Sequence, residues 1–206
     1  MSKKTLGKIK KPSVEEYKRY GKKRKLYLVP LLISGEEMDI SEDYKNKLKK
    51  YWKQVEARLG ELEEKIGRVT KIYCEMVDRE GEKAEEVIQK MDKMLWQMVK
   101  YFLDKGARLK GIEDAVLLRE HFDWLRCLSL NLKSDRVKGF ITSFFAQNLR
   151  ERDEHISGVI NKDLGPEEIA VLFIRENNSL KLARDIEIFR IFPPVLNELR
   201  NYFQRK

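Results

Sequence analysis

The sequence holds few cysteines and no long apolar run, and each absence excludes a class of protein. Cys74 and Cys127 are the only cysteines, and their spacing fits neither a zinc site nor a disulfide framework. No stretch of about 18 apolar residues is present, so we expect no membrane-spanning helix. The N-terminus is basic but lacks the apolar segment of a signal peptide. We therefore expect a cytoplasmic protein with free thiols.

The common catalytic motifs are also missing. The sequence contains no P-loop, no glycine-rich dinucleotide fingerprint and no nucleophile elbow. No cysteine and histidine stand at the spacing of a zinc site. We predict no cofactor and no metal. The missing motifs disfavour the commonest enzyme classes, but they do not exclude rarer ones.

Charge is what the sequence has in excess, and it is unevenly distributed. Charged residues make up 37% of the chain, and the net charge is +9. Residues 1–25 contain eleven Lys or Arg and two Glu, so they account for all of that net charge and residues 26–206 are formally neutral. We interpret residues 1–25 as a flexible basic arm in front of a single domain, residues 26–206.

Clustered basic side chains attract polyanions because binding releases the counterions of the polyanion. We therefore expect the arm to contact RNA, DNA or a ribonucleoprotein, unless it is only a solubilising tail. The residues predicted to bind anions are Lys18, Arg19, Lys22, Lys23, Arg24 and Lys25.

The hydrophobic pattern predicts a helix-rich α/β fold. Apolar residues from Tyr44 to Ile66 recur at alternating steps of four and three, which is typical of one face of a helix. Strands are predicted at 26–33, 69–77, 169–174 and 186–191, and further helices at 14–20, 84–102, 113–130, 134–160 and 195–203. We expect a small sheet of about four strands covered by long helices, with a helical insertion at roughly 82–163 between the second and third strands.

Several short strings resemble an uncharacterised family of bacterial α/β proteins of about this length. They are Tyr27 to Leu31, Tyr51 to Val55, Trp124 to Ser129, Glu151 to Ile156, Val171 to Glu176, and Pro193 to Leu199. The family has no assigned activity, so the resemblance transfers no catalytic residue. It implies that most of residues 25–206 form one evolutionary unit.

Three groups of side chains could carry chemistry. His121 and Cys127 lie six residues apart on a predicted helix and therefore point to nearly opposite faces. We interpret them as a partly exposed histidine and a small core cysteine. Asp153, Glu154 and His155 are consecutive on a helix and do not converge. Because the charged residues 150–152, which include Arg152, precede them, we interpret the whole stretch as a solvated charged face. In parallel sheets, ligands bind beyond the carboxyl ends of strands. Arg175, Glu176, Asn177 and Asn178 follow a predicted strand and could form a polar site, although a plain surface turn is the simpler interpretation.

Three hypotheses for function remain open at this stage. The first is a non-catalytic protein that binds nucleic acid or a ribonucleoprotein through its arm. The second is an enzyme with an unrecognised polar site at the carboxyl ends of the strands. The third is an assembly module in which the helix from Tyr44 to Ile66 pairs with another chain, although nothing in the sequence indicates a homo-oligomer.

Overall fold

The computed structural model describes residues 23–32 and 41–204. The helix predicted at 14–20 and the arm residues Lys18, Arg19 and Lys22 lie outside these ranges. Within the described residues, none of the helices has the length and apolar character needed to cross a bilayer.

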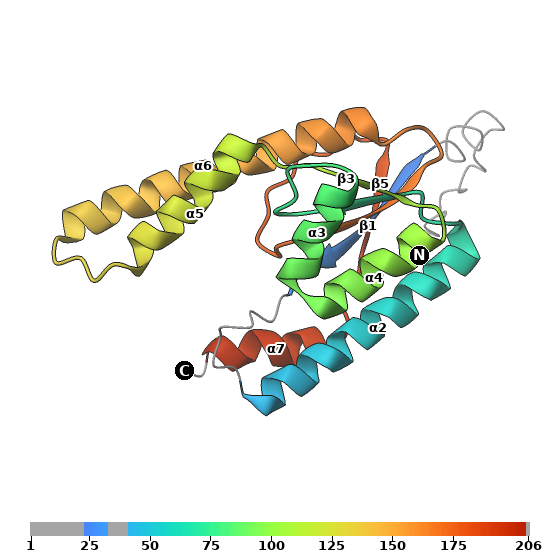
Figure 1. The fold of residues 1–206 in the computed structure, drawn as a ribbon, viewed down its shortest axis with the longest axis horizontal. Coiled ribbons are helices and arrows are strands. Elements are labelled where there is room, and N and C mark those ends of the chain that lie inside the picture. Colours follow the sequence, from blue (N-terminus) through green and yellow to red (C-terminus); the bar gives the residue numbers. More distant parts are fainter. Residues whose placement is uncertain (1–22, 33–40, 205–206) are drawn as a thin grey trace, which may run out of the picture.

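A parallel five-stranded sheet forms the centre of the molecule (Figure 1). Its strands stand in the order β3-β2-β4-β1-β5. They are β1 (Arg24–Pro30), β2 (Lys71–Cys74), β3 (Arg108–Lys110), β4 (Ile169–Ile174) and β5 (Ile186–Arg190). The two central strands, β1 and β4, come from opposite ends of the sequence and pair in register, with Leu28 beside Leu172.

The predicted fold class is confirmed, but the strand count was one too low. The missed strand is β3, which has only three residues and lies within the segment 82–163 that we expected to be helical. A run this short carries no detectable alternation of apolar and polar residues. The insertion between the second and third predicted strands therefore contains one strand as well as four helices.

Six helices are present in the described residues: α2 (Glu42–Ile66), α3 (Glu82–Met91), α4 (Lys93–Asp104), α5 (Ala115–Ser129), α6 (Asp135–Asp163) and α7 (Val195–Gln204). Gly67 ends α2, and the Ser134 hydroxyl accepts a hydrogen bond from the Val137 amide at the start of α6. The single helix predicted at 84–102 is two helices. Asp92 separates them because its carboxylate caps α4, accepting hydrogen bonds from two backbone amides.

One face of the sheet is covered by α2, α3, α4 and α7, which share its larger hydrophobic core. The stripe of α2 that we considered as a surface for assembly lies in this core: its residues Tyr44, Leu48, Trp52, Val55, Leu59 and Leu62 are all buried. The hypothesis that this stripe pairs with another chain is therefore wrong. An apolar stripe shows that a helix face is covered, but it does not show what covers it.

The other face of the sheet is covered by the second half of α6 and by residues 175–185, which connect β4 to β5. Ile156, Ile160 and Leu164 pack there against Leu26 and Leu172 of the central strands. Alternate residues of β1, β2 and β4 therefore face the two cores, as expected for strands that are buried on both sides.

The first half of α6 leaves the sheet and runs outward beside α5 (Figure 1). We call α5, residues 130–134 and α6 the hairpin. Among the described elements, α5 packs chiefly on α6. Most of the hairpin therefore projects from the body as a pair of antiparallel helices.

Candidate functional site

The carboxyl ends of β2 and β4 bring Glu75 and Arg175 together. These strands are neighbours in the sheet, and each residue comes directly after its strand. The chain leaves β2 toward one face of the sheet and leaves β4 toward the other. This is a topological switch point, where open α/β sheets usually bind their ligands. In this protein the position is filled by a cluster of ionic side chains.

Arg152 of α6 lies at the centre of this cluster. Its Nε donates to Glu113 at 3.1 Å, and its Nη2 donates to Glu113 and, at 3.1 Å, to Glu75. Glu113 also accepts a hydrogen bond of 3.1 Å from the backbone amide of Met76, whose φ is 70°. The carboxylate of Glu113 therefore joins the helical hairpin to the strained turn that follows β2.

Arg175 extends the cluster toward the loop after β4. Its guanidinium donates to Glu75 and, at 2.6 Å, to Asp153. The backbone amide of Arg175 donates to Glu75 at 2.6 Å, and the amide of Ser179 donates to Asp153 at 2.7 Å. Three carboxylates and two guanidinium groups thus connect β2, β4, α6 and the loop after β4. We call Glu75, Glu113, Arg152, Asp153 and Arg175 the ion cluster.

Four of the five side chains of the ion cluster are buried, and only that of Arg175 is partly exposed, at 22%. The side chains of Arg152 and Glu113 are fully buried, and those of Glu75 and Asp153 are only 2% and 4% exposed. Burial alone would lower the pKa of Arg152, but the hydrogen bond to Glu113 and the charges of its neighbours raise it above its ordinary value. The guanidinium therefore stays charged, and no substrate reaches it in this conformation.

His121 of α5 lies near the ion cluster and is buried, with its ring stacked on Phe145 at 5.3 Å. Burial and the positive charge of Arg152 lower the pKa of His121 to about 4, while Glu75 acts in the opposite direction. The imidazole is therefore neutral at neutral pH. We had expected a partly exposed His121 and a core Cys127, but Cys127 is the more exposed of the two.

The four residues predicted to form a polar site after β4 do not converge. Arg175 enters the ion cluster, whereas Glu176 turns away and pairs with Arg200. The side-chain amide of Asn178 donates to the backbone oxygen of Arg175 at 2.8 Å, a hydrogen bond typical of a turn. Asn177 is exposed. Only one of the four therefore belongs to a buried constellation.

Four members of the ion cluster were missed in the sequence. Arg152 and Asp153 belong to a stretch that we interpreted as a solvated charged face, and that interpretation is wrong because both are buried. Arg152 lies four residues after Asn148 and four before Ile156, both of them buried, so helical spacing alone places it on the inward side. Glu75 lies inside an apolar predicted strand, which is a second detectable signal. Glu113 has no such signal.

Of the six residues predicted to bind anions, the structure describes Lys23, Arg24 and Lys25. Arg24 is the first residue of β1, and its guanidinium donates to Asp185 at 2.8 Å and to two backbone oxygens at the end of α6. Lys23, directly before this strand, and Lys25 within it are half-buried. The prediction that Arg24 is free to bind anions is therefore wrong.

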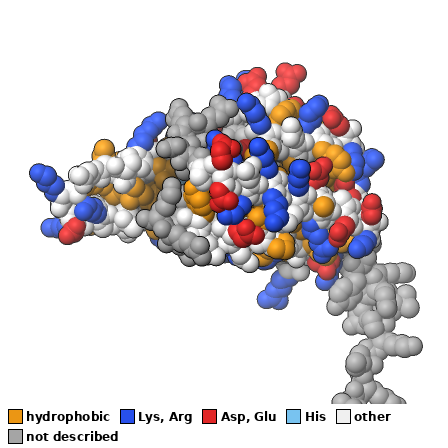
Figure 2. Space-filling model, turned by 90° about the horizontal axis from the view of Figure 1, so that it is seen from below, with side chains coloured by type: hydrophobic (Ala, Val, Ile, Leu, Met, Phe, Trp, Pro, Cys, Tyr) orange, Lys and Arg blue, Asp and Glu red, His pale blue; other side chains and the backbone are white. Residues whose placement is uncertain are grey.

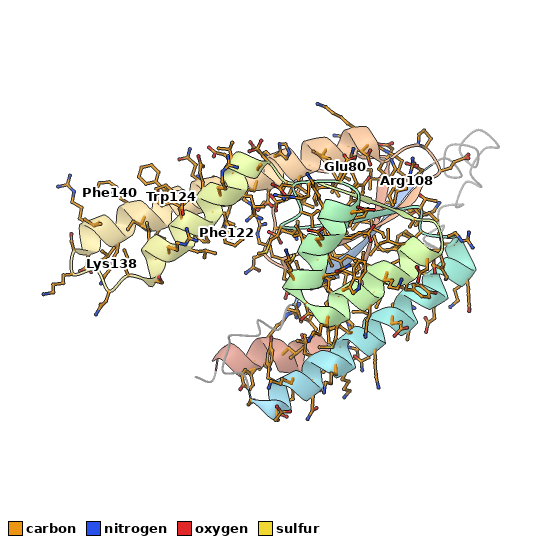
Figure 3. The ribbon with its side chains drawn as sticks, in the orientation of Figure 1. Glu80, Arg108, Phe122, Trp124, Lys138 and Phe140 are labelled. Atoms are coloured by element: carbon orange, nitrogen blue, oxygen red, sulfur yellow. The ribbon has the colours of Figure 1, made fainter. Side chains whose placement is uncertain are left out.

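A cavity of about 420 Å³ lies at the β3 edge of the sheet. Glu80 and Arg108, which Figure 3 labels, line it together with Lys71, Lys110 and Asp163. Its buried cation is already neutralised, because the Lys71 ammonium lies 3.1 Å from Asp163 and 2.9 Å from Glu168. Lys110 likewise pairs with Glu80. The charges of this cavity are mostly satisfied within the chain.

The hairpin is where apolar side chains are exposed. Of the eleven large hydrophobic residues that are exposed in the described part of the chain, eight lie on it: Val116, Phe122, Leu125, Leu128, Leu130, Val137, Phe140 and Phe144. Figure 2 shows hydrophobic side chains along the hairpin and basic ones around its outer end. Phe122, Trp124, Lys138 and Phe140 all lie on the projecting part in Figure 3.

Among the described residues, no group of three His, Cys, Asp or Glu side chains is arranged to hold a metal ion. Comparison with known protein families, curated proteins and solved structures found no match for this chain. The ion cluster and the hairpin are therefore the features of this structure that indicate a function.

Proposed function

We propose that the protein is a non-catalytic assembly protein whose hairpin docks onto a protein partner. The observation that carries the proposal is the concentration of exposed apolar side chains on one projecting element. Phe140 and Phe144 are 52% and 50% exposed there. Large apolar patches on soluble proteins usually mark interaction sites, since their exposure to water is unfavourable.

The ion cluster supports this function by fixing the base of the hairpin. Arg152 and Asp153 belong to α6, and their partners Glu75 and Arg175 belong to the ends of β2 and β4. A rigid attachment lowers the entropy that the hairpin would lose on binding. The largely buried cluster thus supports a positioning role better than the alternative of an enzyme site at the strand ends.

Site-specific photocrosslinking in the source organism tests the proposal. The photoreactive residue benzoylphenylalanine replaces Phe140 or Phe122 on the hairpin, one position per variant. The matched control is Phe192, an aromatic residue on the body that is 48% exposed. We expect discrete protein adducts from at least one hairpin position and none from Phe192. The absence of hairpin adducts in cells that contain the folded protein would contradict the proposal.

A second candidate function, binding of RNA or DNA by the basic arm, rests on a separate observation. The whole net charge of +9 is contributed by residues 1–25, whereas residues 26–206 are neutral. Such a segregation favours non-specific attraction to polyanions. Because Arg24 is held by Asp185, this function falls to the basic residues that precede it.

Substitutions in the full chain test the arm. Lys18, Arg19 and Lys22 are replaced together by glutamine, and the control replaces Lys49, Lys50 and Lys53, which are exposed on α2. Fluorescence anisotropy with short RNA and DNA probes is measured across a salt series. We expect the arm variant to bind more weakly and with a smaller salt dependence, and the α2 variant to bind like wild type. Equal binding by all three proteins would show that the basic arm does not bind nucleic acid and is only a solubilising tail.

A further inference from the structure

The hairpin presents apolar side chains on two opposite sides. Phe122 and Trp124 are two residues apart on α5, so they point about 200° away from each other. Trp124 stacks on Phe144 of α6, with ring centroids 5.4 Å apart. The side of Trp124 and Phe144, which we call the distal face, contains five residues with helical spacing of three or four: Trp124, Leu128, Val137, Phe140 and Phe144.

The charges of the hairpin are separated along its length. Its tip, residues 125–146, contains four basic residues and one acidic residue, a net charge of +3. Its root, residues 114–124 and 147–155, contains six acidic and three basic residues, a net charge of −3. The 15 residues of α5 span about 22 Å, nearly three times the Debye length of about 8 Å at physiological salt, so the charges at the two ends of the hairpin are largely screened from each other.

We propose that the partner of the distal face is a second copy of this chain, bound antiparallel about a two-fold axis. This inference rests on the proposed function of the hairpin and names its partner. In this arrangement the basic tip of each chain lies beside the acidic root of the other, and the two distal faces pack as an antiparallel four-helix assembly. A polyanion would be repelled by the root, and a parallel pair would place like charges side by side.

The exposed area of the distal face suits a dimer. Leu128, Val137, Phe140 and Phe144 are 40–52% exposed, which corresponds to on the order of 400 Å² of apolar surface per chain. Because only about 57% of an ordinary interface is apolar, this implies roughly 700 Å² per chain in total, close to the usual 800 Å². An interface of this size without a large aromatic anchor pocket supports a dissociation constant in roughly the micromolar range.

Sedimentation of the purified full chain across a concentration series tests the apolar contact. We expect a monomer–dimer equilibrium, and we expect Phe140→Ser on the distal face to weaken dimerisation roughly tenfold or more. Two controls should leave it unchanged: Phe122→Ser on the opposite side of the hairpin, and Phe192→Ser on the body. A dimer that is weakened equally by all three substitutions, or by Phe122→Ser alone, would overturn the assignment of the distal face.

Charge reversal tests the antiparallel arrangement without altering the apolar face. Lys133→Glu with Lys138→Glu changes the tip from +3 to −1, and Glu120→Lys with Glu151→Lys changes the root from −3 to +1. Each variant alone should dimerise roughly tenfold more weakly than wild type. Mixing the two should restore dimerisation as a heterodimer, because opposite charges then meet at both ends. Failure of the mixture to associate would exclude the antiparallel pairing.

The outcomes separate this inference from the proposed function. A strict monomer at concentrations of hundreds of micromolar overturns the dimer, and photocrosslinking of Phe140 to a different protein would then still support a docking hairpin. A strict monomer without any adduct in cells would contradict both.

Discussion

Arg152 is the residue that most affects how the hairpin is held. It is fully buried, and it faces Glu75 and Glu113, which are buried as well. A buried ion pair gains little over an apolar replacement of the whole group, because each charge loses its hydration. Removal of one partner is different, since the remaining charges lose both water and their counterion. The position therefore tolerates no single substitution that removes the positive charge.

We predict that Arg152→Met destabilises the protein by about 3–5 kcal/mol, because Glu113 loses its ionic partner in the interior and Glu75 retains only Arg175. Urea denaturation followed by circular dichroism measures the change. Arg150→Met is the matched control: Arg150 is exposed on the same helix, and its loss should cost no more than about 0.5 kcal/mol. Similar losses in the two variants would show that the cluster does not brace the fold.

His121 makes the stability depend on pH. Its pKa is about 4 in the folded protein and its ordinary value is 6.5, so between these values the unfolded chain binds more protons. The free energy of unfolding therefore falls as the pH drops from about 6.5 to 4. The charged groups near the imidazole are Arg152, Arg175 and Glu75, whose opposing effects are already included in the lowered pKa.

We predict that His121→Phe, which keeps an aromatic ring beside Phe145, removes this contribution. Between pH 7 and pH 4.5 the variant should lose about 2–3 kcal/mol less of its unfolding free energy than wild type does. Urea titrations at the two pH values give the comparison. Parallel losses in both proteins would mean that the His121 imidazole is protonated in the folded state.

At the scale of the element, the segment between β3 and α5 is fixed by a close backbone approach. A Cβ at Gly111 would stand 2.6 Å from the backbone oxygen of Arg79. The next two residues donate their amides to the backbone oxygen of Val77, and the second of them is Glu113 of the ion cluster. The absence of a side chain at Gly111 therefore brings Glu113 into reach of Arg152.

We predict that Gly111→Ala destabilises the protein by about 1–3 kcal/mol, because backbone has to move to admit the methyl group. Gly60→Ala in α2 is the control. No atom lies within 4 Å of a Cβ at Gly60, so this substitution should stabilise the helix by up to about 1 kcal/mol. Thermal unfolding distinguishes the two, and a stabilising Gly111→Ala would contradict the close approach.

The sequence predicted most elements because long periodic patterns are informative. The strand at 169–174 coincides with β4, and the helix from Tyr44 to Ile66 differs from α2 only at its start. The break between α3 and α4 at Asp92 was not predicted, because the helical spacing of apolar residues continues on both sides of it, although an aspartate often caps a helix. The ion cluster was mostly missed because its members meet only after β2, β4 and α6 have packed together.

At the scale of the whole molecule, periodicity could not separate the hairpin from the body. Leu128, Val137, Phe140 and Phe144 repeat with the same spacing as core residues. In the structure they lie on the projecting part, where no other described element covers them. A sequence pattern shows that a face is apolar, whereas exposure depends on where the rest of the chain goes.

The strand order has a consequence for how the protein is made. Leu28 of β1 pairs with Leu172 of β4, which is 144 positions further along the chain. At about 5–20 residues per second, a ribosome needs on the order of 10–30 s to add that distance. During this interval the apolar residues of β1 have neither of their neighbouring strands, since β5 comes later still. The nascent chain therefore carries an unpaired hydrophobic strand for most of its synthesis, and we expect it to depend on chaperones until β4 emerges.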